Sequence, residues 1–169
     1  MRGDGGRALR VTLAAVLVAG VAAGENAAGS AEQTQLMLAR FAARFAEVGP
    51  QVGEHLDELY AADVTFRDPL TSLTGIADLS RYLAHFGETA RGARFTITDT
   101  VAQPGNAVVF WTMTPAGGGD PIDGVSHLRV RDRVYDERDY FDLGAVYDRV
   151  PVLRWFTGVV KSRLAPPSP

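Results

Sequence analysis

The first part of the chain combines helical patterns with one short strand. Apolar side chains recur three or four residues apart after residue 36, which predicts an amphipathic helix that Gly49-Pro50 ends. The same spacing predicts a short helix over about residues 52–60 and another helix after Gly75. Between those two, residues 64–66 predict a short strand that ends at Asp68-Pro69, because proline cannot donate to a strand ladder. The predicted order is therefore helix, helix, strand, helix.

From about residue 93 onward the hydrophobic period changes from helical to alternating. Strands are predicted over residues 95–101, 108–114, 122–130 and 134–142. Consecutive antiparallel strands after a group of helices indicate an α+β domain with helices on one sheet face. The tail from about Ala145 to Leu164 returns to helical spacing and predicts a last helix.

The last predicted strand contains the run Arg138-Asp139-Tyr140-Phe141-Asp142-Leu143. In this run Asp139 shares a face with Phe141, so a core-facing Phe141 brings the carboxylate inward too. A carboxylate on an apolar face must be paired, shifted in pKa or set in a cavity. Asp139 is therefore either a structural charge paired with an arginine or a functional group.

Composition restricts the class of protein. A chain of 169 residues suggests a single domain, here residues 32–165, with a short disordered tail at 166–169. The net charge of −3 provides no basic surface, so we expect no nucleic-acid partner. There is no cysteine, and the three histidines stand far apart, so disulfides are excluded and neither a metal site nor a cofactor is expected.

Residues 1–31 have the pattern of a signal peptide or a disordered leader. Three arginines precede an apolar run from Val11 to Gly24, which is too short to span a bilayer but has the length of a signal-peptide core. This predicts export to a secreted or periplasmic location, with no integral membrane span in the mature chain. The alternatives are a disordered extension, or a true start at Met37, in a cytoplasmic protein.

Several segments together resemble a known superfamily. Residues 59–69, followed by Gly75-Ile76, resemble the SnoaL-like branch of the nuclear-transport-factor-2-like superfamily, and the match continues through 124–129, 138–142 and the tail. It covers about residues 34–165. The resemblance implies a cone-shaped curved antiparallel sheet, a partial α+β barrel wrapped around helices, with an apolar pocket at its wide end. It also implies a homodimer formed through the outer sheet face.

Two enzymes of this superfamily suggest roles for the two aspartates. The general base of ketosteroid isomerase matches Asp68, while Ser126 stands where that enzyme has a protonated aspartic acid. One aspartate of the Asp-Arg-Asp set of limonene epoxide hydrolase matches Asp139, while Trp111 and Met113 occupy the other two positions. The resemblance thus implies that this chain has one catalytic carboxyl group in common with each enzyme. It lacks the other catalytic residues that complete either set.

An apolar cavity with a few convergent polar groups is the default ligand site. We expect its catalytic groups to be Asp68 and Asp139, and its ligand-binding residues to be Phe66, Trp111, Met113, Ser126, Leu128, Glu137 and Phe141. One hypothesis is a cofactor-free isomerase, cyclase or hydrolase that uses Asp68 as general base. The other is a non-catalytic carrier or dimerisation module, in which Asp68 merely caps a turn before Pro69. The partner is a small hydrophobic molecule in both enzyme and carrier.

Overall fold

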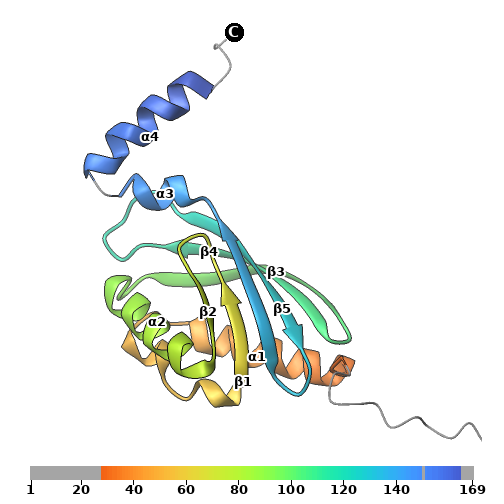
Figure 1. Ribbon diagram of the computed structural model, residues 1–169. Coiled ribbons are helices and arrows are strands. Elements are labelled where there is room, and N and C mark those ends of the chain that lie inside the picture. Colours follow the sequence, from red (N-terminus) through yellow and green to blue (C-terminus); the bar gives the residue numbers. More distant parts are fainter. Residues whose placement is uncertain (1–27, 150, 165–169) are drawn as a thin grey trace, which may run out of the picture.

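The computed structural model describes residues 28–149 and 151–164 of the chain, so residues 1–27 of the predicted leader and the predicted tail at 166–169 lie outside the described residues. The last residues of the predicted leader belong to the folded domain instead, because Ser30 caps the first helix and Ala31 begins it. Six strands form one curved, open sheet in the order β2-β1-β6-β5-β4-β3 (Figure 1). The strands are β1 (Tyr60–Arg67), β2 (Ser72–Thr74), β3 (Arg94–Gln103), β4 (Asn106–Thr114), β5 (Ile122–Val130) and β6 (Val134–Phe141). This arrangement confirms the predicted α+β class.

Two long helices pack on one face of the sheet. α1 (Ala31–Phe45) begins at Ser30, whose hydroxyl accepts a hydrogen bond from the Gln33 backbone N–H at 3.1 Å, and it buries Met37 and Phe41. α2 (Ile76–Thr89) follows Gly75 and buries Leu79 and Leu83. Both helices turn their apolar stripes toward the sheet, and the hydrophobic core lies between these layers.

The region between α1 and β2 differs from the prediction. Instead of one helix over residues 52–60, two 3-10 helices, η1 (Pro50–Gly53) and η2 (Leu56–Glu58), lead into β1, which already begins at Tyr60. β1 pairs in parallel with β6 and antiparallel with β2, so the sheet is mixed rather than fully antiparallel. The prediction failed here because Tyr60 pairs with Val134 on the neighbouring strand β6, which is distant in sequence. Local helical spacing carries no information about such a pairing.

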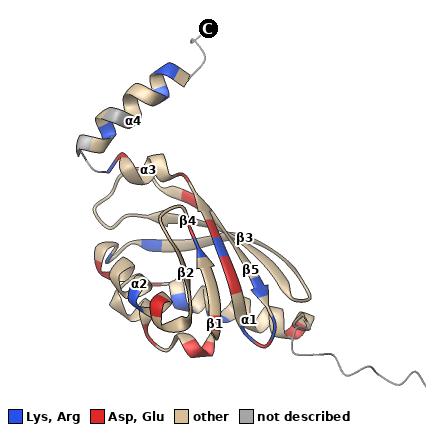
Figure 2. Ribbon diagram, in the orientation of Figure 1, with Lys and Arg blue, Asp and Glu red and all other residues tan. Residues whose placement is uncertain are grey.

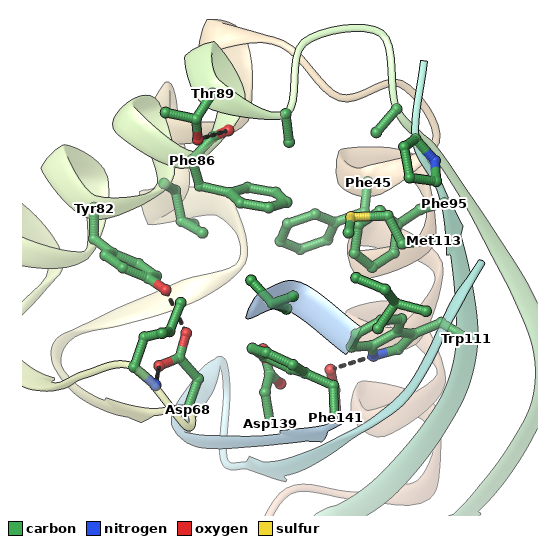
Figure 3. Close-up of a pocket in the computed structure, with 18 of the residues that line it drawn as sticks. Phe45, Asp68, Tyr82, Phe86, Thr89, Phe95, Trp111, Met113, Asp139 and Phe141 are labelled. Atoms are coloured by element: carbon green, nitrogen blue, oxygen red, sulfur yellow. Dashed lines mark hydrogen bonds between the residues drawn. The ribbon is translucent and has the colours of Figure 1, made fainter. Parts of the chain in front are cut away.

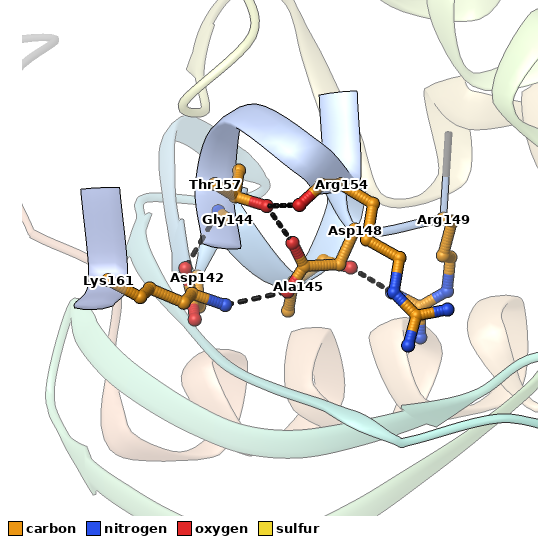
Figure 4. A network of polar contacts seen from close by, with 8 residues as sticks. All are labelled: Asp142, Gly144, Ala145, Asp148, Arg149, Arg154, Thr157 and Lys161. Carbon is orange, nitrogen blue, oxygen red and sulfur yellow. Dashed lines mark hydrogen bonds and ion pairs between the residues drawn. The ribbon is translucent and has the colours of Figure 1, made fainter. Parts of the chain in front are cut away.

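The tail also differs, because it forms two helices rather than one. α3 (Leu143–Tyr147) is capped by Asp142, whose carboxylate accepts from the Gly144 backbone N–H at 2.7 Å. α4 (Pro151–Leu164) starts at a proline, a residue suited to the first helical turn but not to a helix interior, and extends away from the sheet (Figure 1). Lys161 of α4 pairs with Asp148 at 2.6 Å (Figure 4). None of the described helices is both long enough and apolar enough to cross a membrane.

Candidate functional site

A cavity of about 440 Å³ lies between the helices and the inner sheet face (Figure 3). This volume is within the usual range for small-molecule sites. Most of its lining is apolar, and eight aromatic rings contribute to it: Phe41, Phe45, Phe66, Tyr82, Phe86, Phe95, Trp111 and Phe141. The cavity can therefore enclose a small molecule with a largely apolar body.

The aromatic rings form a connected wall rather than separate contacts. Phe95 and Trp111 have ring centroids 4.8 Å apart, and Trp111 and Phe141 follow at 6.2 Å. Across the cavity, Phe66 and Tyr82 are 5.4 Å apart. Such tilted pairs hold each ring in place, so the cavity has a preformed shape.

The strand register places the predicted polar residues together. Glu137, Asp139 and Phe141 alternate along β6 toward the cavity, and Ser126 of β5 pairs directly with Asp139. Every predicted site residue lines the cavity except Leu128, which is fully buried beneath it. Leu128 pairs with Glu137 and therefore lies on the inner face of the sheet, as predicted. Core side chains cover it, so it does not reach the cavity.

Glu137, which is buried, and Asp139, which is half-buried, form a pair of carboxyl groups in the cavity wall. Glu137 is 2% exposed, and its Oε2 atom and the Oδ1 atom of Asp139 are buried without a hydrogen-bond donor. Burial, followed by the charge of Asp139, raises the pKa of Glu137 well above its usual value. Burial likewise raises the pKa of Asp139 to about 7, against the lowering effect of hydrogen bonds from Ser126 and Glu137. Burial thus favours the protonated form of Glu137, while Asp139 can gain or lose a proton near pH 7.

Tyr60 belongs to the same cluster and was not predicted. Its hydroxyl is fully buried at the start of β1, close to Glu137. Burial and the charge of Glu137 raise its pKa far above the usual value, so it stays neutral. The helical pattern over residues 52–60 predicted that Tyr60 faces inward, but not that it meets Glu137, because that contact depends on the parallel pairing of β1 with β6.

Asp68 has a different environment from Asp139. Its Oδ1 accepts hydrogen bonds from the backbone N–H groups of Leu70 and Thr71, both at 2.7 Å, and its Oδ2 accepts from the hydroxyl of Tyr82 (Figure 3). The turn-capping interpretation is therefore correct for one oxygen, although Asp68 also lines the cavity. Oδ1 of Asp68 thus accepts two hydrogen bonds and Oδ2 accepts one.

Tyr82 is a second site residue that the sequence analysis missed. It lies on α2 between Leu79 and Leu83, so it could have been found on the predicted apolar stripe of that helix. Burial, with the hydrogen bond to Asp68, raises its pKa. The hydroxyl therefore remains a donor to Asp68 over the physiological pH range.

Trp111 connects the aromatic wall to the carboxyl cluster. Its indole Nε1 donates to Ser126 Oγ at 3.0 Å, and both side chains are buried. The hydroxyl hydrogen of Ser126 is then available for Asp139, which pairs with Ser126 in the sheet. The row from Trp111 through Ser126 thus orients Asp139 within the cavity.

The rim of the cavity contains two cations. Arg91 follows α2, and Arg149 follows α3. Arg149 donates to the carbonyls of Ala145 and Asp120, each at 2.6 Å, and so ties α3 to the loop between β4 and β5 (Figure 4 shows the bond to Ala145). Within the described part of the chain, no group of three or more His, Cys, Asp or Glu side chains could hold a metal ion.

Comparison with known families identifies the class of protein. The SnoaL-like domain family matches residues 38–135, which is more than half of the chain. The chain therefore belongs to the SnoaL-like domain family. A search of curated proteins finds no significant match.

Solved structures agree with this fold. An NTF2-like protein of unknown function from Mesorhizobium loti is 23% identical, with a TM-score of 0.57 over 66% of this chain and 93% of that one. A candidate SnoaL-like polyketide cyclase from Jannaschia sp. is 18% identical, with a TM-score of 0.59 over 74% and 96%. A candidate isomerase of the SnoaL-like family from Agrobacterium tumefaciens is 15% identical, with a TM-score of 0.57 over 66% and 98%. At these identities the similarity establishes the fold alone.

Proposed function

We propose that the chain binds a small hydrophobic molecule in the cavity and catalyses a cofactor-free proton transfer on it, as an isomerase or cyclase does. The observation that carries this proposal is the Glu137–Asp139 pair on the wall of an apolar cavity. Buried carboxyl groups with shifted pKa values are the usual means by which enzymes run acid–base chemistry near neutral pH.

In this proposal Asp139 is the general base, the role that the sequence analysis assigned to Asp68. Its pKa of about 7 suits a group that must both take and return a proton at physiological pH. Asp139 would remove a proton from an acidic carbon of the ligand and return it at a second carbon, or retain it until ring closure. Asp68, with donors on both oxygens, would orient Tyr82 and shape the rim of the cavity.

A model reaction that does not require the natural ligand can test this assignment. In nitrobenzisoxazole, removal of the ring C–H proton by a base breaks the N–O bond and releases a coloured cyanophenolate. We expect the purified chain to accelerate this reaction, with a rate that rises through about pH 7 as Asp139 ionises. Asp139→Asn should lower the rate by about a hundredfold or more, the typical contribution of a general base.

Two further variants make the result specific. Asp123→Asn is the matched control, because Asp123 is exposed on β5 and accepts a hydrogen bond from Thr112 rather than facing the cavity. Asp68→Asn should leave most of the rate. If Asp68→Asn removes the rate instead, Asp68 is the base. If the cavity binds the probe but neither Asp139 nor Asp68 contributes to the reaction rate, the chain is a carrier.

A further inference from the structure

We propose that the cavity selects an organic cation, that is, a protonated or quaternary amine carried on an apolar body. This inference rests on the proposed function only in taking the cavity as the ligand site. It names the chemical class that fits both the charge and the rings of the wall.

The first observation is the charge distribution around the cavity. Three carboxyl groups line it, those of Asp68, Glu137 and Asp139, and among the described lining residues the cations are the two arginines of the rim. Arg149 is already bonded to two backbone carbonyls there. Figure 2 shows the acidic segments of β6 in the middle of the sheet. The inner wall therefore lacks a protein cation to balance its carboxylates.

The second observation is that the carboxyl pair is not internally satisfied. Glu137 lines the cavity and is 98% buried, yet its Oε2 atom makes no hydrogen bond, and the same is true of Asp139 Oδ1 and of the neighbouring Tyr60 hydroxyl. A buried acceptor without a partner is costly, and one shared proton can satisfy only part of the pair. A cation in the cavity would supply the missing positive charge.

The third observation is the aromatic wall. Trp111 lies between Phe95 and Phe141, and all three rings line the cavity together with Asp139. Aromatic faces attract ammonium groups through the ring quadrupole, most strongly where water is excluded. Carboxylates and rings together thus favour a cation over a neutral molecule of the same shape.

Such binding must depend on pH. The groups that face Asp139 are Glu137 on β6, Tyr60 on β1, Asp68 after β1 and Tyr82 on α2, and both tyrosines stay neutral. A cation favours ionised Asp139, so its binding should release a proton and strengthen as the pH rises through about 7. A neutral ligand should show no such gain.

Two probes of one shape and a related anion test the proposal. Phenyltrimethylammonium is the cation, tert-butylbenzene is its neutral isostere, and para-tert-butylbenzoate is the anion. We expect the cation to bind at least about tenfold more tightly than the neutral isostere at pH 8, with the preference much reduced at pH 5.5. Isothermal titration calorimetry or ligand-observed NMR on the full chain would measure the affinities.

Variants assign the preference to a residue. Asp139→Asn should abolish the preference while neutral binding persists, and Asp123→Asn should leave it unchanged. Equal or tighter binding of the neutral isostere at pH 8 would overturn the proposal, and so would a preference for the anion, which would instead implicate Arg91 and Arg149. The pH series on the unmodified chain decides the matter even if a variant fails to fold.

The nitrobenzisoxazole reaction separates this inference from the proposed function, because that probe is neutral. Turnover that depends on Asp139 without a preference for the cation would overturn this inference and would still support the proposed enzymatic function. A preference for the cation that depends on Asp139, without turnover, would support the ligand class and refute catalysis.

Discussion

At the scale of single residues, the raised pKa of Asp139 lowers the stability of the fold at neutral pH. Its pKa is about 7 in the folded protein, while an unfolded chain releases this proton near pH 4. Between these values the folded state binds more protons than the unfolded state, so the free energy of unfolding falls as the pH rises. The loss should be a few kcal/mol at most, because the side chain of Asp139 is only partly buried.

Asp139→Asn should remove this part of the pH dependence. Urea unfolding at pH 4.5 and pH 7.5 would measure it, and we expect the variant to lose less stability over this range than the unmodified chain. Asp123→Asn, exposed on the neighbouring strand, serves as the control. If the profile of Asp139→Asn matches that of the unmodified chain, the carboxyl of Asp139 is not held above its usual pKa.

At the scale of elements, the packing of β4 against β5 sets the wall of the cavity. Gly124 of β5 pairs with Trp111 of β4, and a Cβ atom on Gly124 would overlap the indole ring. Gly124→Ala should therefore push Trp111 from its position, break its bond to Ser126 and cost about 1–3 kcal/mol of unfolding free energy. Urea unfolding and near-UV circular dichroism would record the two effects.

Gly117→Ala is the matched control for this change. Gly117 lies in the loop between β4 and β5, and an added Cβ atom there meets nothing within 4 Å. Its unfolding free energy and its aromatic signals should match those of the unmodified chain. An unchanged aromatic signal in Gly124→Ala would show that Trp111 does not depend on the space that this glycine leaves.

At the scale of the whole molecule, the outer sheet face is suited to self-association. Phe110, Val125 and Tyr140 stand in register on three adjacent strands, and Phe110 and Tyr140 are 38% and 51% exposed. A row of this kind on an open sheet is typical of a covered surface. The homodimer that the resemblance implies through this face stays a prediction, with Phe110, Val125 and Tyr140 as its expected contacts.

Light scattering would measure the assembly. We expect a dimer at micromolar concentration, and Val125→Glu should convert it to a monomer by placing charges opposite each other across the two-fold axis. Leu164→Glu is the control, since Leu164 is 79% exposed on α4, away from the sheet. A stable monomer of the unmodified chain would refute the interface.

Much of the fold and part of the site follow from local sequence alone. Apolar spacing determined α1 and α2, and the alternation along β6 placed Glu137, Asp139 and Phe141 on one face. Side-chain direction within a helix or strand is a local property of the backbone, so a pattern of a few residues is enough to predict it. For the same reason most of the residues predicted for the site lie along the cavity.

Only the tertiary structure decided how the carboxyl groups differ. Asp68 and Asp139 look alike in the sequence, but Tyr82 and two backbone N–H groups occupy the oxygens of Asp68, while Asp139 meets Glu137 inside the cavity. The neighbourhood of Glu137 also includes Tyr60, which is distant along the chain. Burial and hydrogen-bond partners arise where distant segments meet, and these, rather than residue type, determine whether a carboxyl group caps a turn or can act as a base.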